Sequence, residues 1–176
     1  MSIMKKYRFF LITLGIFTVL FFINREKAAE AIQITGYSLK EMITVIPPIF
    51  VLLGLLDVWV PRELMIRYMG EKSGIVGIVL AIILGSAAAG PLYGAFPVAA
   101  VFMKKGVKFS NVLIFIGAWS TTKVPMFLFE MSSLGSLFAF TRLLVDIPGI
   151  IIIAFIIARI TPKDELRKIY KNAEKF

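Results

Sequence analysis

The sequence predicts an all-α membrane protein with four transmembrane helices and a re-entrant hairpin made of a broken helix. Three observations lead to this prediction. Of the 176 residues, 59% are hydrophobic and 18% are charged, whereas roughly 25% of the residues in a soluble domain are charged. Apolar runs that could cross a bilayer recur along the chain. Lys and Arg gather in short clusters beside these runs, where they set topology and contact anionic lipid.

Four apolar runs have about the 17–25 residues that a helix needs to cross the hydrocarbon core of a bilayer. They cover residues 8–23, 43–60, 110–129 and 136–158. The first run follows a basic N-terminus, as a signal peptide does, but Arg25, Glu26 and Lys27 separate it from the small residues that a signal peptidase would cleave. We therefore expect an uncleaved first span. In the second run, Pro47-Pro48 predicts a kink or a break.

The apolar stretch 73–103 is too long for one span and too short for two, and the distribution of charge decides between the alternatives. If the N-terminus is cytoplasmic and this stretch returns to the side it entered, only Arg25, Lys27 and Lys40 of the 20 Lys and Arg face outward. A single crossing would put the basic cluster at 104–108 and that of the tail outside, against the positive-inside rule. The sequence therefore predicts a hairpin, and a multi-pass protein of the cell (inner) membrane with both termini cytoplasmic.

The tip of this hairpin is the first candidate site. Residues 90–97 contain two Gly and two Pro, which break helices and permit unusual backbone dihedrals. Unwound backbone at membrane depth is tolerated only where it is buried in protein or lines a wet cavity. We therefore predict substrate contacts at four tip residues, Gly90, Pro91, Gly94 and Pro97. The alternative is that the tip and the small residues 85–89 before it only allow helices to pack closely.

Ionisable groups within the spans need a reason, because each costs roughly 2.5–3.5 kcal/mol to insert. Lys123 and Glu130 share a face of one predicted span. Arg142 and Asp146 share a face of the next one. One interpretation is a closed structural network, in which Arg142 pairs with Asp146. Lys123 then pairs with Glu130. The other interpretation is a polar cavity, in which Lys123, Arg142 and the positive end of a half-helix at Pro97 bind an anionic substrate.

The residues around Lys123 and the two carboxylates extend this candidate site. Thr121 and Thr122 are candidate substrate contacts, although hydroxyls in spans often bond back to their own helix. Glu130 and Asp146 are either ion-pair partners or coupling residues that carry a proton.

Residues 161–176 predict a basic helix on the cytoplasmic surface. Thr161 provides a capping hydroxyl, Pro162 occupies the first helical position and Asp164 places an acid in the first turn. We assign no chemistry to this tail. Residues 1–160 then form the transmembrane domain.

Two segments resemble a known family. The sequence GPLYGAFPVAAVFMKKG at 90–106 resembles the Gly-Pro…Ala-Phe-Pro…Lys-Gly signature of the predicted permease family that includes the ArsP organoarsenical exporters. The order of Lys123, Glu130 and Arg142 is also similar to that family, and the similarity covers about 46–160. Typical members are about twice as long and carry two related halves, so the resemblance implies a half-length, second-half-like member.

The resemblance implies a permease but leaves its substrate open. The ArsP exporters are associated with cysteines near the corresponding motif, where thiolates suit soft trivalent arsenic. This chain has no cysteine. Arsenic specificity is therefore not carried over.

Several other classes of function are not expected. The chain has no Cys and no His, so it lacks thiolate nucleophiles, imidazole acid–base groups and the usual zinc ligands. Its formal charge of +9 does not form the basic stripe with exposed aromatic residues that binds nucleic acid. A phosphate-binding loop is also missing from the sequence. We therefore expect no enzyme, no catalytic residues, no cofactor and no metal site.

Together these features predict a permease-like transporter subunit in the lipid bilayer. It would move a small molecule or ion, with an anion or oxyanion as the candidate substrate, and would work as a homodimer or with a second permease half. The alternative is a non-transporting scaffold or accessory subunit, in which the buried charges only hold helices together.

Overall fold

The computed structural model describes residues 7–88 and 90–174, without some of the side chains between 41 and 57. All regular structure in this part of the chain is helical and it contains no strand, which confirms the predicted all-α class. The chain divides into two compact units, Met1–Pro48 and Ile49–Phe176.

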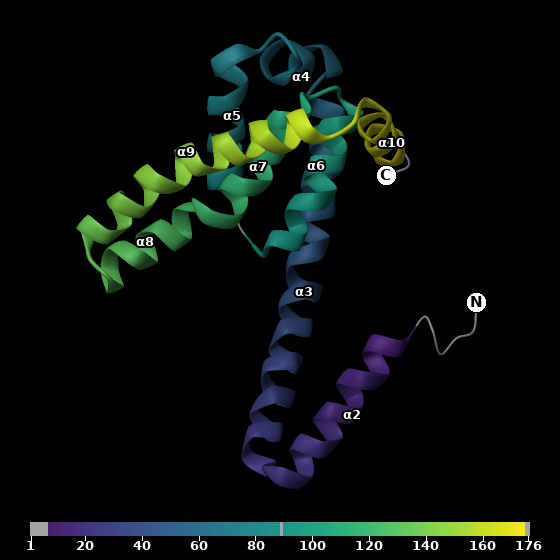
Figure 1. Cartoon of the computed structure of the whole chain (residues 1–176), viewed down its shortest axis with the longest axis vertical. Coiled ribbons are helices and arrows are strands. Elements are labelled where there is room, and N and C mark those ends of the chain that lie inside the picture. The colour runs from purple at the N-terminus through teal and green to yellow at the C-terminus, as the bar shows by residue number, and fades with distance from the viewer. Residues whose placement is uncertain (1–6, 89, 175–176) are drawn as a thin grey trace. The chain divides into compact units, whose positions relative to one another are not determined.

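The first unit contains α2 (Arg8–Ile23) and the start of α3 (Arg25–Trp59), which diverge from a tight turn (Figure 1). Asn24 forms this turn with an extended backbone. Its side-chain oxygen accepts a hydrogen bond of 3.0 Å from the amide of Lys27. Asn24 therefore caps the first turn of α3, because one of the unpaired amides at the helix N-terminus gains a partner.

α3 differs from the predicted second span in two ways. It begins at Arg25 rather than at residue 43, and it continues through Pro47 and Pro48 without the break that is one of the two outcomes predicted there. The other outcome, a kink, stays a prediction. Each Pro removes one helical hydrogen bond. A complete break would strand further carbonyl groups in apolar surroundings, where no water can bond them. The continuous helix therefore loses fewer hydrogen bonds than a broken one.

Two helical segments in the described residues are long and apolar enough to cross a membrane, Phe109–Ser133 and Ser136–Ile160. A third spanning segment would result if α4 (Arg62–Met69) and α5 (Gly74–Ala87) formed one broken span, although they are bent by 111° to each other. The helices at the predicted spans 110–129 and 136–158 thus have the required length. α2 is apolar but shorter, so spans at 8–23 and 43–60 stay predictions.

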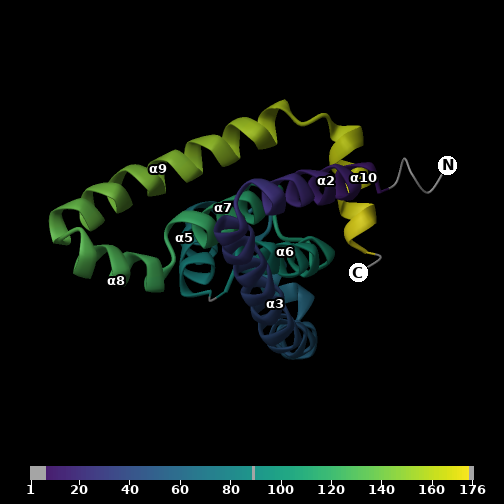
Figure 2. The same cartoon turned by 90° about the horizontal axis from the view of Figure 1, so that it is seen from below.

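The second unit is built around α7 (Phe109–Thr121), which lies between α5 and α9 (Ser136–Ile160). Two glycines allow this close packing. A Cβ at Gly85 of α5 would lie 2.5 Å from the carbonyl oxygen of Phe115, and a Cβ at Gly117 of α7 would lie 2.7 Å from the side chain of Ile150 in α9. α8 (Val124–Ser133) leads away from α7, and α9 then folds back along it (Figures 1 and 2).

Aromatic side chains fill the space between α7 and α6 (Ala95–Lys104). The ring of Phe115 lies 4.8 Å from that of Phe102 and 5.6 Å from that of Trp119 between centroids. All three side chains are buried. Phe102 therefore anchors the returning helix α6 to the centre of the unit, with the tilted ring contacts that aromatic pairs favour.

The stretch between α5 and α7 returns to the place where it begins. The backbone amide of Lys108 donates a hydrogen bond of 2.9 Å to the carbonyl of Met69. The side-chain amide of Asn111 donates to the same carbonyl oxygen at 2.8 Å. The two ends of the hairpin thus share one hydrogen-bonding centre, while re-entry into the membrane stays a prediction.

The unwound part of the hairpin tip is shorter than 90–97. Ala88 and Pro91 are extended, and Gly90 has a φ of 99°, a conformation that residues other than Gly rarely adopt. A single 3₁₀ turn, η1 (Leu92–Gly94), then leads into α6. Helical structure therefore resumes at Leu92, near the start of the predicted tip.

The tail helix α10 (Lys163–Ala173) packs against α6. The hydroxyl of Tyr170 donates a hydrogen bond of 2.7 Å to the carbonyl of Val107, just after α6. Burial, with a smaller contribution from the charge of Glu71, raises the pKa of Tyr170 to about 12. The phenol therefore stays protonated at neutral pH and keeps its role as donor.

Replacing Gly85 by Ala should force α5 away from α7, because the added methyl group would meet the backbone of α7 and the Cβ of Ala118 at 2.7 Å. We expect a destabilisation of about 1–3 kcal/mol, measured by unfolding of the purified protein in mixed detergent. Gly149→Ala in α9 is the matched control, since a Cβ there meets nothing within 4 Å. Equal stability of the two variants would contradict the close approach of α5 and α7.

Candidate functional site

Two interruptions of the helices in the second unit come together. The first is the unwound segment around Gly90, and the second separates α7 from α8 at Thr122 and Lys123. Pro125 explains the second interruption, because it has no N–H to donate to the carbonyl of Thr121 four residues earlier. Both interruptions leave backbone carbonyls without a helical partner, and these need other donors in apolar surroundings.

Lys123 and Trp119 supply the donors at the first interruption. The ammonium nitrogen of Lys123 donates a hydrogen bond of 2.9 Å to the carbonyl of Gly90. The indole N–H of Trp119 reaches the same oxygen at 3.3 Å. The side chain that begins α8 thereby holds the unwound tip of the hairpin.

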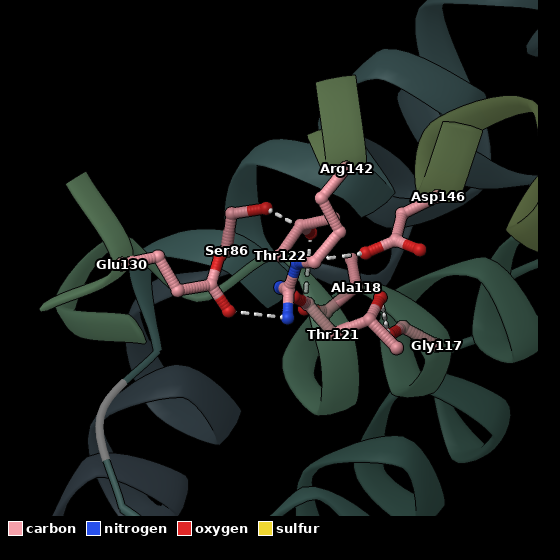
Figure 3. A network of polar contacts seen from close by, with 8 residues as sticks. All are labelled: Ser86, Gly117, Ala118, Thr121, Thr122, Glu130, Arg142 and Asp146. Carbon is pink, nitrogen blue, oxygen red and sulfur yellow. Dashed lines mark hydrogen bonds and ion pairs between the residues drawn. The ribbon is translucent and has the colours of Figure 1, made fainter. Parts of the chain in front are cut away.

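Arg142 supplies the donor at the second interruption. Its guanidinium donates to the carbonyl of Thr121, the group that Pro125 leaves without a helical partner. Arg142 reaches this carbonyl from α9, a different helix (Figure 3). A charge-assisted bond to a long side chain thus replaces the missing bond within the helix.

The same guanidinium pairs with two carboxylates (Figure 3). One nitrogen of Arg142 lies 2.6 Å from an oxygen of Glu130, and its Nε lies 3.3 Å from an oxygen of Asp146. Glu130 is 5% exposed, whereas a quarter of the Asp146 side chain is exposed, at 25%. The buried carboxylate therefore depends on Arg142 far more than the one that water can reach.

One oxygen of Glu130 is left without a partner. Its Oε2 atom is buried and makes no hydrogen bond with the described residues. An unsatisfied buried acceptor costs about 1–3 kcal/mol, and more when it is charged. Stability alone does not favour such an arrangement, so this oxygen is open to a hydrogen-bond donor.

The two threonines at the end of α7 bond to their own helix. The hydroxyl of Thr121 donates to the carbonyl of Gly117 at 3.0 Å, and that of Thr122 lies 3.1 Å from the carbonyl of Ala118. Thr122 also lies 2.7 Å from the hydroxyl of Ser86 in α5. In this conformation Thr122 links α7 to α5, whereas Thr121 bonds only within α7. A contact of either threonine with substrate stays a prediction.

The interpretation as a closed structural network predicts two ion pairs, of which one is confirmed and the other is wrong. Arg142 pairs with Asp146, as the spacing of four residues predicts. Lys123 does not pair with Glu130 in this structure, since it bonds to Gly90 and Arg142 takes the carboxylate. The physical reason is the break before α8, which turns Lys123 away from the helix that carries Glu130. The prediction treats both residues as parts of one continuous helix.

The four predicted tip residues do not form one site. Gly90 joins the network of Lys123, and Pro91 follows it in the extended segment. Gly94 is buried where a Cβ would lie 2.5 Å from Ile49. Pro97 lies within α6 and lines a separate apolar groove that also touches α7 and α10. Close packing thus explains Gly94, in agreement with the alternative interpretation of the tip.

Ser86 and Trp119 belong to the network, and the sequence did not single them out as site residues. Ser86 stands within the run of small residues before the tip, where a short side chain suggests helix packing and not a polar contact. Trp119 stands one turn before Lys123 on α7. Its indole N–H needs a partner when buried, which was the available signal, but only the fold identifies the Gly90 carbonyl as that partner.

The network has no excess of formal charge, with two cations and two carboxylates. Lys123 is nevertheless bonded only to a neutral carbonyl, and no carboxylate of the described residues lies within ion-pair distance of it. The described residues also contain no group of three or more acidic side chains that could hold a metal ion.

A family model described as ArsP_1, predicted permease, matches residues 27–175. No curated protein and no solved structure matches the chain.

Replacing Arg142 by Met should cost much more stability than replacing Asp146 by Asn. Arg142→Met leaves the buried Glu130 without its counter-charge, a loss of about 3–5 kcal/mol. Asp146→Asn removes a partly exposed pair, with an effect of about 1 kcal/mol or less. Unfolding in mixed detergent measures both, with Arg159→Met at the exposed end of α9 as the control for charge. Equal losses for Arg142→Met and Arg159→Met would rule out a supporting role of this network.

Proposed function

This chain belongs to the predicted permease family, and from that premise we propose that it is a transporter subunit that moves a small anion or oxyanion across the membrane. Its apolar helices of spanning length agree with a membrane transporter. The observation that carries the choice of an anion is the state of Lys123. This cation is half-buried and bonds to a neutral backbone carbonyl, so its charge has no ion-pair partner among the described residues.

Exchange of partners provides a route for the substrate. An oxyanion that approaches Lys123 would offer a charged acceptor, which forms a stronger hydrogen bond than the carbonyl of Gly90. Loss of the bond between Lys123 and Gly90 would free the tip of the hairpin, with only Trp119 still bonded to that carbonyl. Substrate binding would in this way be coupled to movement of the unwound segment, as in transporters with broken helices.

Arg142 supports the same site from the other side. It is bonded to the end of α7, the helix that leads to Lys123, and to both carboxylates. A substrate oxygen could replace Asp146, the more exposed of its partners, without leaving Glu130 unpaired. Glu130 and Asp146 are therefore the candidate coupling residues in this proposal, and Thr121 and Thr122 line the route between the two cations.

The complete transport path needs a second copy or a second half. The described part of one chain offers two helices of spanning length, or three if the bent pair counts as one, and transporter sites normally lie between two repeats. A C2 homodimer with its axis along the membrane normal is the simplest arrangement that doubles the helices and keeps both termini cytoplasmic.

We expect dimers in native mass spectra of the protein in mild detergent, and monomers alone would overturn the homodimer in favour of a separate partner half.

A scaffold without transport is the second candidate, because the contacts of Arg142 resemble a closed structural network. Its guanidinium already serves two carboxylates and one carbonyl. Joint apolar replacement of Arg142, Glu130 and Asp146 separates the two functions. A structural network tolerates the joint replacement, whereas a transporter would lose its response to ligand.

A thermal-stability screen of the purified protein against inorganic anions, metalloid oxyanions, metal cations and small metabolites tests the transporter. A ligand at one hundred times its Kd should stabilise the protein by about 2.7 kcal/mol through mass action. We expect an anion to do so in the wild type and in Lys163→Met, a control on the exposed tail, but not in Lys123→Met. Stabilisation that survives in Lys123→Met would exclude Lys123 as the anion-binding residue, and the absence of any stabilising ligand would favour the scaffold.

A further inference from the structure

A second polar feature lies around Ser110, at the opposite end of α7 from Thr121. Eleven residues at 1.5 Å each put Ser110 about 16 Å from Thr121 along the helix. Here residues of α5, α7 and α9 line a half-open cavity of about 190 Å³. Ile75, Ile78 and Phe155 form its apolar wall, and Lys108 and Ser110 are among the residues of its polar wall. The transport site described above does not include any of these residues.

Ser110 is buried in the wall of this cavity without a hydrogen-bond partner. The residue is 1% exposed, and its hydroxyl oxygen makes no bond with the described residues. The neighbouring Asn111 is satisfied, because its amide bonds to the carbonyl of Met69 and, at 3.2 Å, to the hydroxyl of Ser73. A buried hydroxyl without a partner costs about 1–3 kcal/mol, so a ligand that bonds to it would recover that loss.

The surroundings of Ser110 favour a negatively charged ligand. Ser110 stands in the first turn of α7, where the helix dipole is positive and the backbone amides of Phe109 and Ser110 have no bond among the described residues. Lys108 immediately precedes the helix and adds a full positive charge. Its ammonium lies 3.4 Å from the carboxylate of Glu71, most of whose side chain is exposed, at 76%. Glu71 is therefore a competing anion that can move into water when another one binds.

We propose that this cavity binds a phosphate group, either the phosphodiester of an anionic lipid or a free phosphate. The amides at the start of α7, the Ser110 hydroxyl and the Lys108 ammonium are the donors, a combination that recurs where helix N-termini bind phosphate. If the phosphate belongs to a lipid, the acyl chains lie along Ile75, Ile78 and Phe155. The basic cluster at 104–108, which the charge distribution places on the cytoplasmic side, puts this site at the level of the lipid headgroups.

Three ligands distinguish the parts of this proposal, each added to the delipidated full-length protein in mild detergent. They are phosphatidylglycerol, inorganic phosphate and diacylglycerol, which has acyl chains but no phosphate. Native mass spectrometry measures the bound lipids, and the shift in melting temperature measures all three. We expect phosphatidylglycerol to bind more tightly than diacylglycerol. Binding of inorganic phosphate with the same dependence on Ser110 and Lys108 would identify a free anion as the source, and its absence would identify the lipid.

The variants test the individual donors. Lys108→Met should weaken phosphatidylglycerol binding about tenfold, since a hydrogen bond to a charged group is lost. Lys108→Arg should restore it. Lys163→Met removes the same charge from the exposed tail and should leave the affinity unchanged. Glu71→Gln should strengthen binding, because the competing carboxylate is gone.

Ser110→Ala separates binding from folding. Without ligand this variant should be as stable as the wild type or more stable, because an unsatisfied buried hydroxyl is removed. With phosphatidylglycerol it should bind about fivefold more weakly. Unchanged affinity in both Ser110→Ala and Lys108→Met would overturn the proposal, as would diacylglycerol binding as tightly as phosphatidylglycerol.

Discussion

The structure of the second unit depends on one constraint, which is that backbone carbonyls at helix interruptions must find donors where water is scarce. The carbonyls of Gly90 and Thr121 lose their helical partners at the two interruptions. Lys123 and Trp119 serve the first of them, and Arg142 serves the second. Because each cation comes from a different segment than the carbonyl it serves, these bonds tie the hairpin, α7, α8 and α9 together. Without them, each interruption would leave an unpaired polar group in the core.

The same bonds place charge where it can be exchanged. A guanidinium that serves a carbonyl and two carboxylates gives the buried Glu130 only one contact, and one of its oxygens stays unpaired. An ammonium bonded to a carbonyl keeps its full charge available for an anion. In the proposed transporter, structural support and ligand binding would therefore compete for the same donors. Such competition is a physical basis for movement, because a ligand that takes a donor also releases the segment which that donor holds.

Packing of small residues sets the distances that this network requires. Gly85 lies in the contact between α5 and α7, where a Cβ would meet a neighbouring atom at 2.5 Å. Gly117 lies in the contact between α7 and α9, where the corresponding distance is 2.7 Å. Helices that approach this closely are typical of membrane proteins, in which van der Waals contact replaces the hydrophobic effect between helices. The close approach of α5 also brings Ser86 to Thr122. The polar contacts and the glycine contacts thus depend on each other.

The sequence by itself determined the helical class, the spanning length of the last two apolar runs and the membership of a permease family, and it allowed the pairing of Arg142 with Asp146. These follow from composition, apolar length, a local motif and a spacing of four residues, all of which are properties of neighbouring positions. Only the tertiary structure decided the partners of Lys123 and Glu130, the position of Gly94 in the core and the unpaired hydroxyl of Ser110. Those depend on which distant carbonyl or helix lies opposite each side chain after an interruption turns the chain, and the direction of that turn is not encoded in spacing along the sequence.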